Sequence, residues 1–232
     1  MPKKRSKSSP PPIPPILRAC DKGDLEAVRM HLDAGVPLDI RHDLHPGLMP
    51  VAISRNWVDL IQLLIDRGYD LNAPLGPFQL RPLHLAAGYD FSLSLARMLV
   101  EAGSKVEITD KYGGTPLMRA VGNLELLELL ISKGANLKSR TQQQKTVFMC
   151  AAEVSCFRVM QRLLELGSSV DEMDVKDETA LHWAAKRGDA KVVQWLLEHG
   201  ADRTLRDYCK YTPLDWAREN DHSEVVKLLE QA

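Results

Sequence analysis

Hydrophobic residues recur along this chain in adjacent pairs that lie four residues apart. Leu60, Ile61, Leu64 and Ile65 form one such run, and the same spacing returns at 126–131 and at 192–197. This spacing places a wide apolar stripe on one face of an α-helix, so each run predicts an amphipathic helix. A glycine follows each run and is expected to end the helix, because Gly adopts the left-handed conformation without steric cost. These glycines lie 31 to 35 residues apart, at Gly35, Gly68, Gly103, Gly134, Gly167 and Gly200.

A second, shorter helix is predicted upstream of each run. Its centre carries small residues, as in Ala86-Ala87, Ala151-Ala152 and Ala184-Ala185, which let two helices pack closely. Thr115-Pro116 and Thr212-Pro213 are predicted helix starts, since Pro at the first helical position gives up no hydrogen bond. The pattern therefore predicts a pair of helices repeated about every 33 residues.

The short-helix segments read RPLHLAA from residue 81, TPLMRAV from 115, TVFMCAA from 146, TALHWAA from 179 and TPLDWAR from 212. They resemble the T-P-L-H-x-A signature of the ankyrin repeat family, and DKYGGT at 110 and GADRTLRD at 200 resemble its turns. The resemblance implies an all-α ankyrin-repeat solenoid, in which stacked helix-turn-helix units with β-hairpin-like turn tips share one core. We expect about seven units, the first two with weaker signatures, at residues 13–41, 42–74, 75–109, 110–140, 141–173, 174–206 and 207–232.

The fourth expected unit is two residues shorter than its siblings, between Val121 and the following helix. The missing positions are those that Glu153-Val154 and Lys186-Arg187 fill in later units. The third unit carries extra residues near Tyr89-Asp90 and near residues 74–77. We therefore expect a notch at Gly122 beside a ridge, with sequence drift in a surface turn as an equal alternative.

Residues 1–12 read as a tail that is basic, then Ser-rich, then Pro-rich, and it has too little apolar surface to order itself. Lys3, Lys4, Arg5 and Lys7 resemble a nuclear localisation signal, although such basic tails are commonly only solvated. Export is not expected, because no apolar stretch follows these basic residues. We expect a protein of the cytoplasm, the nucleus or both.

The composition favours a soluble protein, with 44% hydrophobic and 26% charged residues. No apolar run approaches the roughly 18 residues that a membrane span requires. The net charge is -1, and without the four tail cations the body carries about -5, which argues against nonspecific nucleic-acid binding. The four cysteines show no CxxC spacing and are expected to be reduced.

Enzyme motifs for nucleotides, zinc proteases and serine hydrolases are not found in the sequence, so we expect no catalysis and no cofactor. The resemblance implies that His84 and His182 hydrogen-bond between adjacent units. Asp39, His42 and His45 lie close together, but a polar hairpin tip explains them better than a metal site, since nothing fixes four ligands.

Two further residue types are interpreted as packing groups. Cys150 stands where a sibling unit has Trp183, which favours packing over thiol reactivity. Trp183, Trp195 and Trp216 are expected in the core, because large aromatic side chains supply much of the burial of a core.

The resemblance implies that a partner protein or peptide binds in a concave groove formed by the turn tips and short helices. Over half of the Phe and Tyr residues fall at these positions, and Tyr and Arg often dominate interface energetics. Chance is the alternative, since turn tips tolerate many residues. We expect a monomeric adaptor, scaffold or inhibitor; a regulatory subunit or assembly chaperone of a larger complex is the alternative. The candidate groove residues are Phe78, Tyr89, Lys111, Tyr112, Lys145, Lys176, Lys186, Arg187, Tyr208 and Tyr211.

Asn72 is a weaker candidate for modification. The segment LIDRGYDLN resembles the ankyrin sequence that asparaginyl hydroxylase recognises, with Asn72 as its target. Many ankyrin units carry this pattern for structural reasons, so structure alone explains it equally well.

Overall fold

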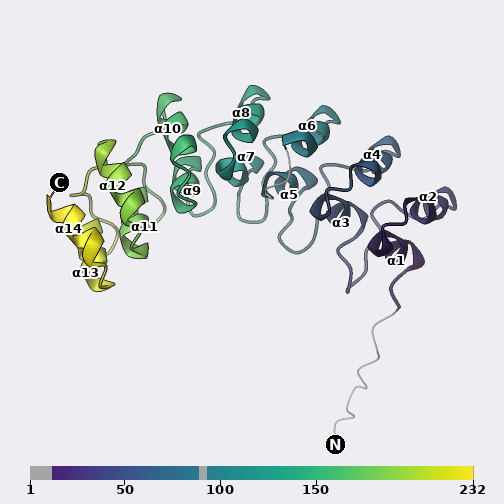
Figure 1. Cartoon of the computed structure of the whole chain (residues 1–232), viewed down its shortest axis with the longest axis horizontal. Coiled ribbons are helices and arrows are strands. Elements are labelled where there is room, and N and C mark those ends of the chain that lie inside the picture. Colours follow the sequence, from purple (N-terminus) through teal and green to yellow (C-terminus); the bar gives the residue numbers. More distant parts are fainter. Residues whose placement is uncertain (1–11, 89–92, 232) are drawn as a thin grey trace, which may run out of the picture.

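The computed structural model describes residues 12–88 and 93–231, and within them the chain forms a stack of antiparallel helix pairs. Figure 1 shows the pairs side by side in chain order, from α1 and α2 at one end to α13 and α14 at the other. The first helices of the pairs are α1 (Pro15–Lys22), α3 (Leu48–Ser54), α5 (Pro82–Gly88), α7 (Pro116–Arg119), α9 (Val147–Glu153), α11 (Ala180–Arg187) and α13 (Pro213–Glu219). Their partners are α2 (Leu25–Asp33), α4 (Val58–Asp66), α6 (Leu93–Glu101), α8 (Leu124–Ser132), α10 (Phe157–Glu165), α12 (Ala190–Glu198) and α14 (Ser223–Gln231).

The starts of several first helices are fixed by threonine caps. The side-chain oxygens of Thr115, Thr146, Thr179 and Thr212 each accept a hydrogen bond from the backbone N–H three residues on. Such a cap satisfies one of the donors that a helix start leaves unpaired. The Thr-Pro pattern therefore marked real helix starts.

The second helices end as the glycine pattern predicted. All six glycines that follow the apolar runs have positive φ angles, between 80° and 98°. A side chain at these positions would be strained, so Gly ends the helix and turns the chain toward the next tip.

One continuous core runs through the stack. Side chains from first and second helices alike are buried, among them Ile53, Leu60, Leu83, Leu127 and Leu196, each at 0% exposure. First helices pack on the first helices of the neighbouring pairs, as α11 does on α9 and α13. The all-α solenoid is confirmed, because no strand forms in the described ranges and the tips contain only isolated bridges, such as Leu75 with Leu80.

The short fourth pair is compact rather than broken. α7 and α8 begin at Pro116 and Leu124, whereas α9 and α10 begin at Val147 and Phe157, so two residues are missing. A 3₁₀ turn at Ala120–Gly122 replaces the last α-helical turn, and it covers more length per residue than an α-helix. Ala120 and Val121 stay buried, so the core is intact at the notch.

Two predictions fall largely or wholly outside the described residues. The N-terminal tail does, apart from Pro12, and so do the ridge residues Tyr89 and Asp90. None of the helices that the structure describes combines the length and apolar character needed to cross a membrane.

Candidate protein-binding surface

Five turn tips share one local geometry. Each has a residue with positive φ near its apex, at Gln79, Gly113, Gln144, Asp177 and Lys210. In the last four tips, a backbone hydrogen bond closes the turn, as from the Asp110 N–H to the Gly114 oxygen at 2.9 Å. Each of these tips is therefore a closed turn that lies just before the start of a first helix.

Neighbouring tips are joined by a series of backbone hydrogen bonds, which we call the tip ladder. One N–H of each of the last four tips donates to a carbonyl of the preceding tip, so the last five tips form a continuous surface. The ladder bonds run from Lys111 to Phe78 (2.9 Å), Gln142 to Tyr112 (2.9 Å), Val175 to Gln143 (3.0 Å) and Tyr208 to Lys176 (2.9 Å).

Four of the candidate aromatic residues lie on this surface and are exposed: Phe78 at 52%, Tyr112 at 54%, Tyr208 at 75% and Tyr211 at 38%. The rings of Phe78 and Tyr112 pack on each other across adjacent tips, 6.2 Å between centroids. Tyr211 packs on Trp216, 5.0 Å between centroids. Held in place by their neighbours, these rings lose little entropy when a partner covers them.

Two candidate lysines lie against tryptophans of the following pair. The Lys145 Nζ lies 4.4 Å from the Trp183 ring centroid, and the Lys186 Nζ lies 3.7 Å from that of Trp216. Each amine also pairs with a carboxylate of its own unit. Lys145 pairs with Glu153 at 2.6 Å, and Lys186 pairs with Glu178 at 2.5 Å. Both lysines thus help to hold the stack and are only partly exposed.

These contacts correct one expectation. Trp183 and Trp216 are half-buried groove residues rather than members of the core, whereas Trp195 packs against the core from α12. The indole N–H of Trp216 donates to the Asp207 carboxylate at 2.7 Å, which helps to fix the orientation of the ring. The sequence pattern missed this because helical spacing does not show which face a neighbouring unit leaves open.

The remaining candidate cations are exposed. Lys111 and Lys176 lie on the tips, and the Arg187 guanidinium donates to the Glu153 carbonyl oxygen of the preceding pair at 2.9 Å. Arg119 is a groove residue that the sequence did not single out, and it pairs with Asp110 at 3.1 Å. Tyr89 lies outside the described residues.

Aspartates anchor the tips from below. Burial by itself would raise the pKa of Asp110, but hydrogen bonds from the N–H groups of Tyr112 and Gly114 and from Arg119 outweigh it and lower the pKa. In Asp207, likewise, hydrogen bonds led by that of Trp216 overcome burial and lower the pKa. Both groups are therefore ionised carboxylates at neutral pH.

The two signature histidines connect adjacent pairs, as the resemblance implied. Nδ1 of His84 accepts from the Arg81 N–H, so Nε2–H donates to the Gly114 carbonyl at 3.0 Å. His182 does the same with the Thr179 N–H and the Tyr211 carbonyl at 3.2 Å. Burial lowers the pKa of both imidazoles, which keeps them neutral.

The other groups considered for chemistry have structural partners. Nδ1 of His45 accepts from the Gly47 N–H at 2.9 Å and Nε2 lies 3.2 Å from the Asp21 carboxylate, so His45 holds its turn on α1. Within the described ranges, no three His, Cys, Asp or Glu side chains gather as a metal site would need. Burial raises the pKa of Cys150 to about 11, which fits a packing role rather than a reactive thiol.

Asn72 lies at a turn between pairs. Its side-chain oxygen accepts from the Lys105 N–H at 2.9 Å and its carbonyl oxygen accepts from the Arg81 guanidinium at 3.0 Å. These bonds give Asn72 a structural role, and its hydroxylation stays a prediction.

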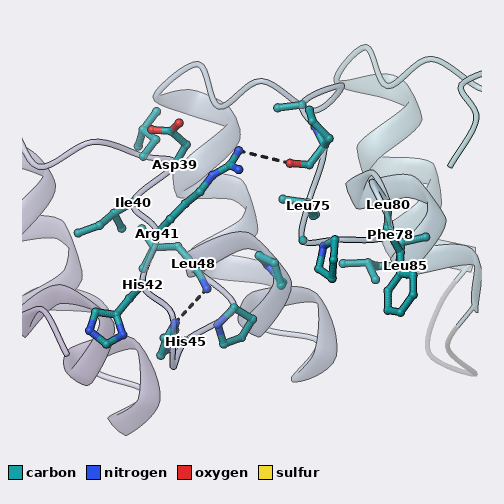
Figure 2. A pocket seen from close by; sticks show the side chains of 18 of the residues that line it. Asp39, Ile40, Arg41, His42, His45, Leu48, Leu75, Phe78, Leu80 and Leu85 are labelled. Atoms are coloured by element: carbon teal, nitrogen blue, oxygen red, sulfur yellow. Dashed lines mark hydrogen bonds between the residues drawn. The ribbon is translucent and has the colours of Figure 1, made fainter. Parts of the chain in front are cut away.

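A cleft of about 740 Å³ opens between the tip at residues 42–45 and the tip at residues 75–80, and we call it the tip cleft. These are the second and third tips, numbered by the unit to which each belongs. Figure 2 shows His42 and His45 on one wall and Leu75, Leu80 and Phe78 on the other. The Arg41 guanidinium reaches across to the Pro74 carbonyl oxygen at 3.4 Å. The sequence pattern did not predict this cleft, which interrupts the tip surface.

The architecture defines a helical-repeat solenoid whose recurring polar contacts join adjacent pairs. Models of "Ankyrin repeats (3 copies)" match residues 16–110, 48–141, 83–174 and 148–232. The chain therefore belongs to the ankyrin repeat family, whose repeats are protein-protein interaction modules.

Three curated relatives illustrate the range of proteins that this chain resembles. It is 30% identical over 144 residues to human Ankyrin repeat and SOCS box protein 6, covering 58% of this chain and 34% of the relative. It is 32% identical over 124 residues to the Probable 26S proteasome regulatory subunit p28 of Saccharomyces cerevisiae, covering 51% and 54%. It is 37% identical over 82 residues to human Ankyrin repeat domain-containing protein 37, covering 34% and 51%. The chain thus spans about a third to a half of the length of these relatives.

Proposed function

We propose that this protein is a non-catalytic adaptor, scaffold or inhibitor that binds a partner protein through its tips and the groove behind them. The observation that carries the proposal is the row of exposed aromatic side chains Phe78, Tyr112, Tyr208 and Tyr211, mounted on tips joined by backbone hydrogen bonds. Aromatic residues are enriched among interface hot spots because they bury a large area at a small entropic cost. The exposed cations Lys111, Lys176 and Arg187 supply the polar rim.

Replacing Tyr112 and Tyr211 together by Ala tests this surface. Binding of partners recovered by affinity purification should weaken at least tenfold, since two aromatic contacts would be lost. The free energy of unfolding should change by no more than about 1 kcal/mol, because both rings are exposed. Unchanged partner affinity would contradict the proposal.

The matched control is Val58→Ala. Val58 is exposed at 41% at the start of α4, outside the tips and outside the set of candidate groove residues. Its replacement should alter neither partner affinity nor the pattern of recovered proteins.

The notch at Gly122 is the second part of the surface that we propose to matter. Inserting Lys-Arg after Val121 would restore the length of the sibling units while leaving the buried α8 face in place. We expect partner affinity to fall and thermal stability to be retained. Retained affinity would identify the notch as sequence drift.

A regulatory subunit or assembly chaperone is the second candidate, and the relative named a probable proteasome regulatory subunit favours it. A stoichiometric complex that survives size-exclusion chromatography after affinity purification would support this candidate over a transient adaptor. Fluorescent fusions with and without the Lys3, Lys4, Arg5 and Lys7 charges would test the proposed location in the cytoplasm, the nucleus or both.

A further inference from the structure

The tip cleft lies where one bond of the tip ladder is missing. In each later tip, the ladder donor lies two residues before the residue with positive φ, as Lys111 lies before Gly113 and Tyr208 before Lys210. In the third tip both Gly76 and Gln79 have positive φ, but only Gln79 directly precedes the closing acceptor, Leu80, just as Gly113 precedes Gly114. Counted back from Gln79, the donor position is Pro77. Proline has no backbone N–H, and Pro77 therefore cannot donate to the second tip.

The acceptor position on the second tip is Leu44. Its N–H donates to Nδ1 of His42 at 3.1 Å, just as the N–H of Tyr112 donates to the Asp110 side chain at 2.8 Å. Tyr112 provides a ladder acceptor with its carbonyl oxygen. By this correspondence the Leu44 carbonyl holds the ladder position that faces the tip cleft.

The third tip is also wider than its siblings. Its closing bond runs from Leu75 to Leu80, one residue longer than the bond from Asp110 to Gly114. The extra residue and the missing donor together separate the two tips, and Ile40, Leu75 and Phe78 line the opening. The volume of about 740 Å³ lies within the roughly 300–1,000 Å³ that is usual for ligand pockets.

We propose that the tip cleft binds an extended segment of a partner protein through the large apolar side chain and the main-chain N–H of one residue. The side chain lies among Ile40, Leu75 and Phe78, and the N–H donates to the Leu44 carbonyl. The four complete junctions show what this position accepts, since in each the first residue of a turn donates one N–H there. Adding an extended strand to an exposed backbone edge is an established mode of peptide recognition. The inference rests on the proposed function, because it assigns one anchor of the partner to one site.

A random library of 12-residue peptides displayed on phage, selected on the full chain, tests the cleft without a known partner. Enriched peptides would be synthesised and their dissociation constants measured by fluorescence polarisation. We expect a group of them to share a large apolar residue and to bind Leu75→Lys at least tenfold more weakly. N-methylation of the amide of that residue should also weaken binding at least tenfold, while Val58→Ala should leave it within twofold.

Leu44→Lys provides a second variant in case Leu75→Lys perturbs folding, because Leu44 is 61% exposed. The inference is overturned if no peptide is enriched, if no enriched peptide responds to either lysine variant, or if N-methylation has no effect. Peptides that respond only to the Tyr112→Ala and Tyr211→Ala double variant would overturn the cleft while supporting the groove. Peptides that respond only to the lysine variants would support the cleft and leave the groove unsupported.

Pro77→Ala tests the cause of the opening. It restores an N–H at the donor position, so the new amide should be protected from hydrogen exchange to a degree similar to that of Lys111. The cleft peptides should then bind several-fold more weakly, because the new amide competes for the Leu44 carbonyl. An unprotected amide at position 77 with unchanged peptide binding would overturn the ladder explanation.

Discussion

The junction between α11 and α13 and the junction between α3 and α5 bury similar apolar faces but differ in their polar contacts. At the first, Tyr208 donates a ladder bond, His182 donates to the Tyr211 carbonyl, and His222 pairs with the Lys186 carbonyl at 3.0 Å. At the second, Pro77 stands at the ladder position. The core helices on both sides stay packed.

At two more positions, the α3–α5 junction has a residue without the hydrogen-bonding side chain that the α11–α13 junction has. Pro50 is the third residue of α3, where α11 has His182, so the imidazole that would reach the next tip is missing. Gly47 caps α3 without a side-chain hydrogen bond, where α11 has Thr179. The apolar core therefore stacks the units, whereas the signature residues join neighbouring tips and hold them in position.

Cavities in the core should have the largest effect on the free energy of unfolding, and the effect should be similar near the open α3–α5 junction and in the joined part of the stack. Leu60→Ala near the open junction and Leu127→Ala in the joined part each remove a fully buried side chain. Each should lower the free energy of unfolding by about 2–5 kcal/mol, measured by chemical denaturation. A cost well under 1 kcal/mol for Leu60→Ala alone would show that the N-terminal pairs do not share the cooperative core.

Loss of a threonine cap from a first helix should have an intermediate effect, which α3 cannot show because Gly47 caps it without a side-chain hydrogen bond. Thr179→Ala removes the acceptor for the His182 N–H and should cost about 1 kcal/mol. Thr109→Ala, at an exposed site outside the helices, should stay within about 0.5 kcal/mol in the same assay. Equal costs for the two variants would refute the role assigned to the cap.

Acidification should have the smallest effect on stability, and it should act through His84 and His182, which hydrogen-bond between adjacent pairs. Burial holds the pKa of His84 and of His182 below the usual 6.5, so the unfolded chain binds more protons than the folded chain as the pH falls below about 6.5. The contribution of these groups to stability is therefore complete above that pH and declines below it. Denaturation curves between pH 5 and pH 8 should show the decline, and it should be shallower in the His84→Asn and His182→Asn double variant.

Local spacing and short-range hydrogen bonds predicted the helices and their ends, whereas the cross-unit role of the histidines was implied by the family resemblance. Thr179, Gly200 and His182 each act within or beside their own unit. The placement of Trp216 under Lys186 was not predictable in this way, because it depends on how far one unit is offset from the next. Pro77 was visible in the sequence, but its effect required the positions of the neighbouring tips.

The groove tryptophans give the molecule an internal optical reporter. Trp183 and Trp216 lie beneath the amines of Lys145 and Lys186, and indole emission responds to the charge and water near the ring. A protein that binds in the groove will displace water and shift these amines, so binding changes the fluorescence emission of the unlabelled chain. A peptide confined to the tip cleft leaves both rings untouched, and a fluorescence titration would therefore separate the two modes of binding without a dye.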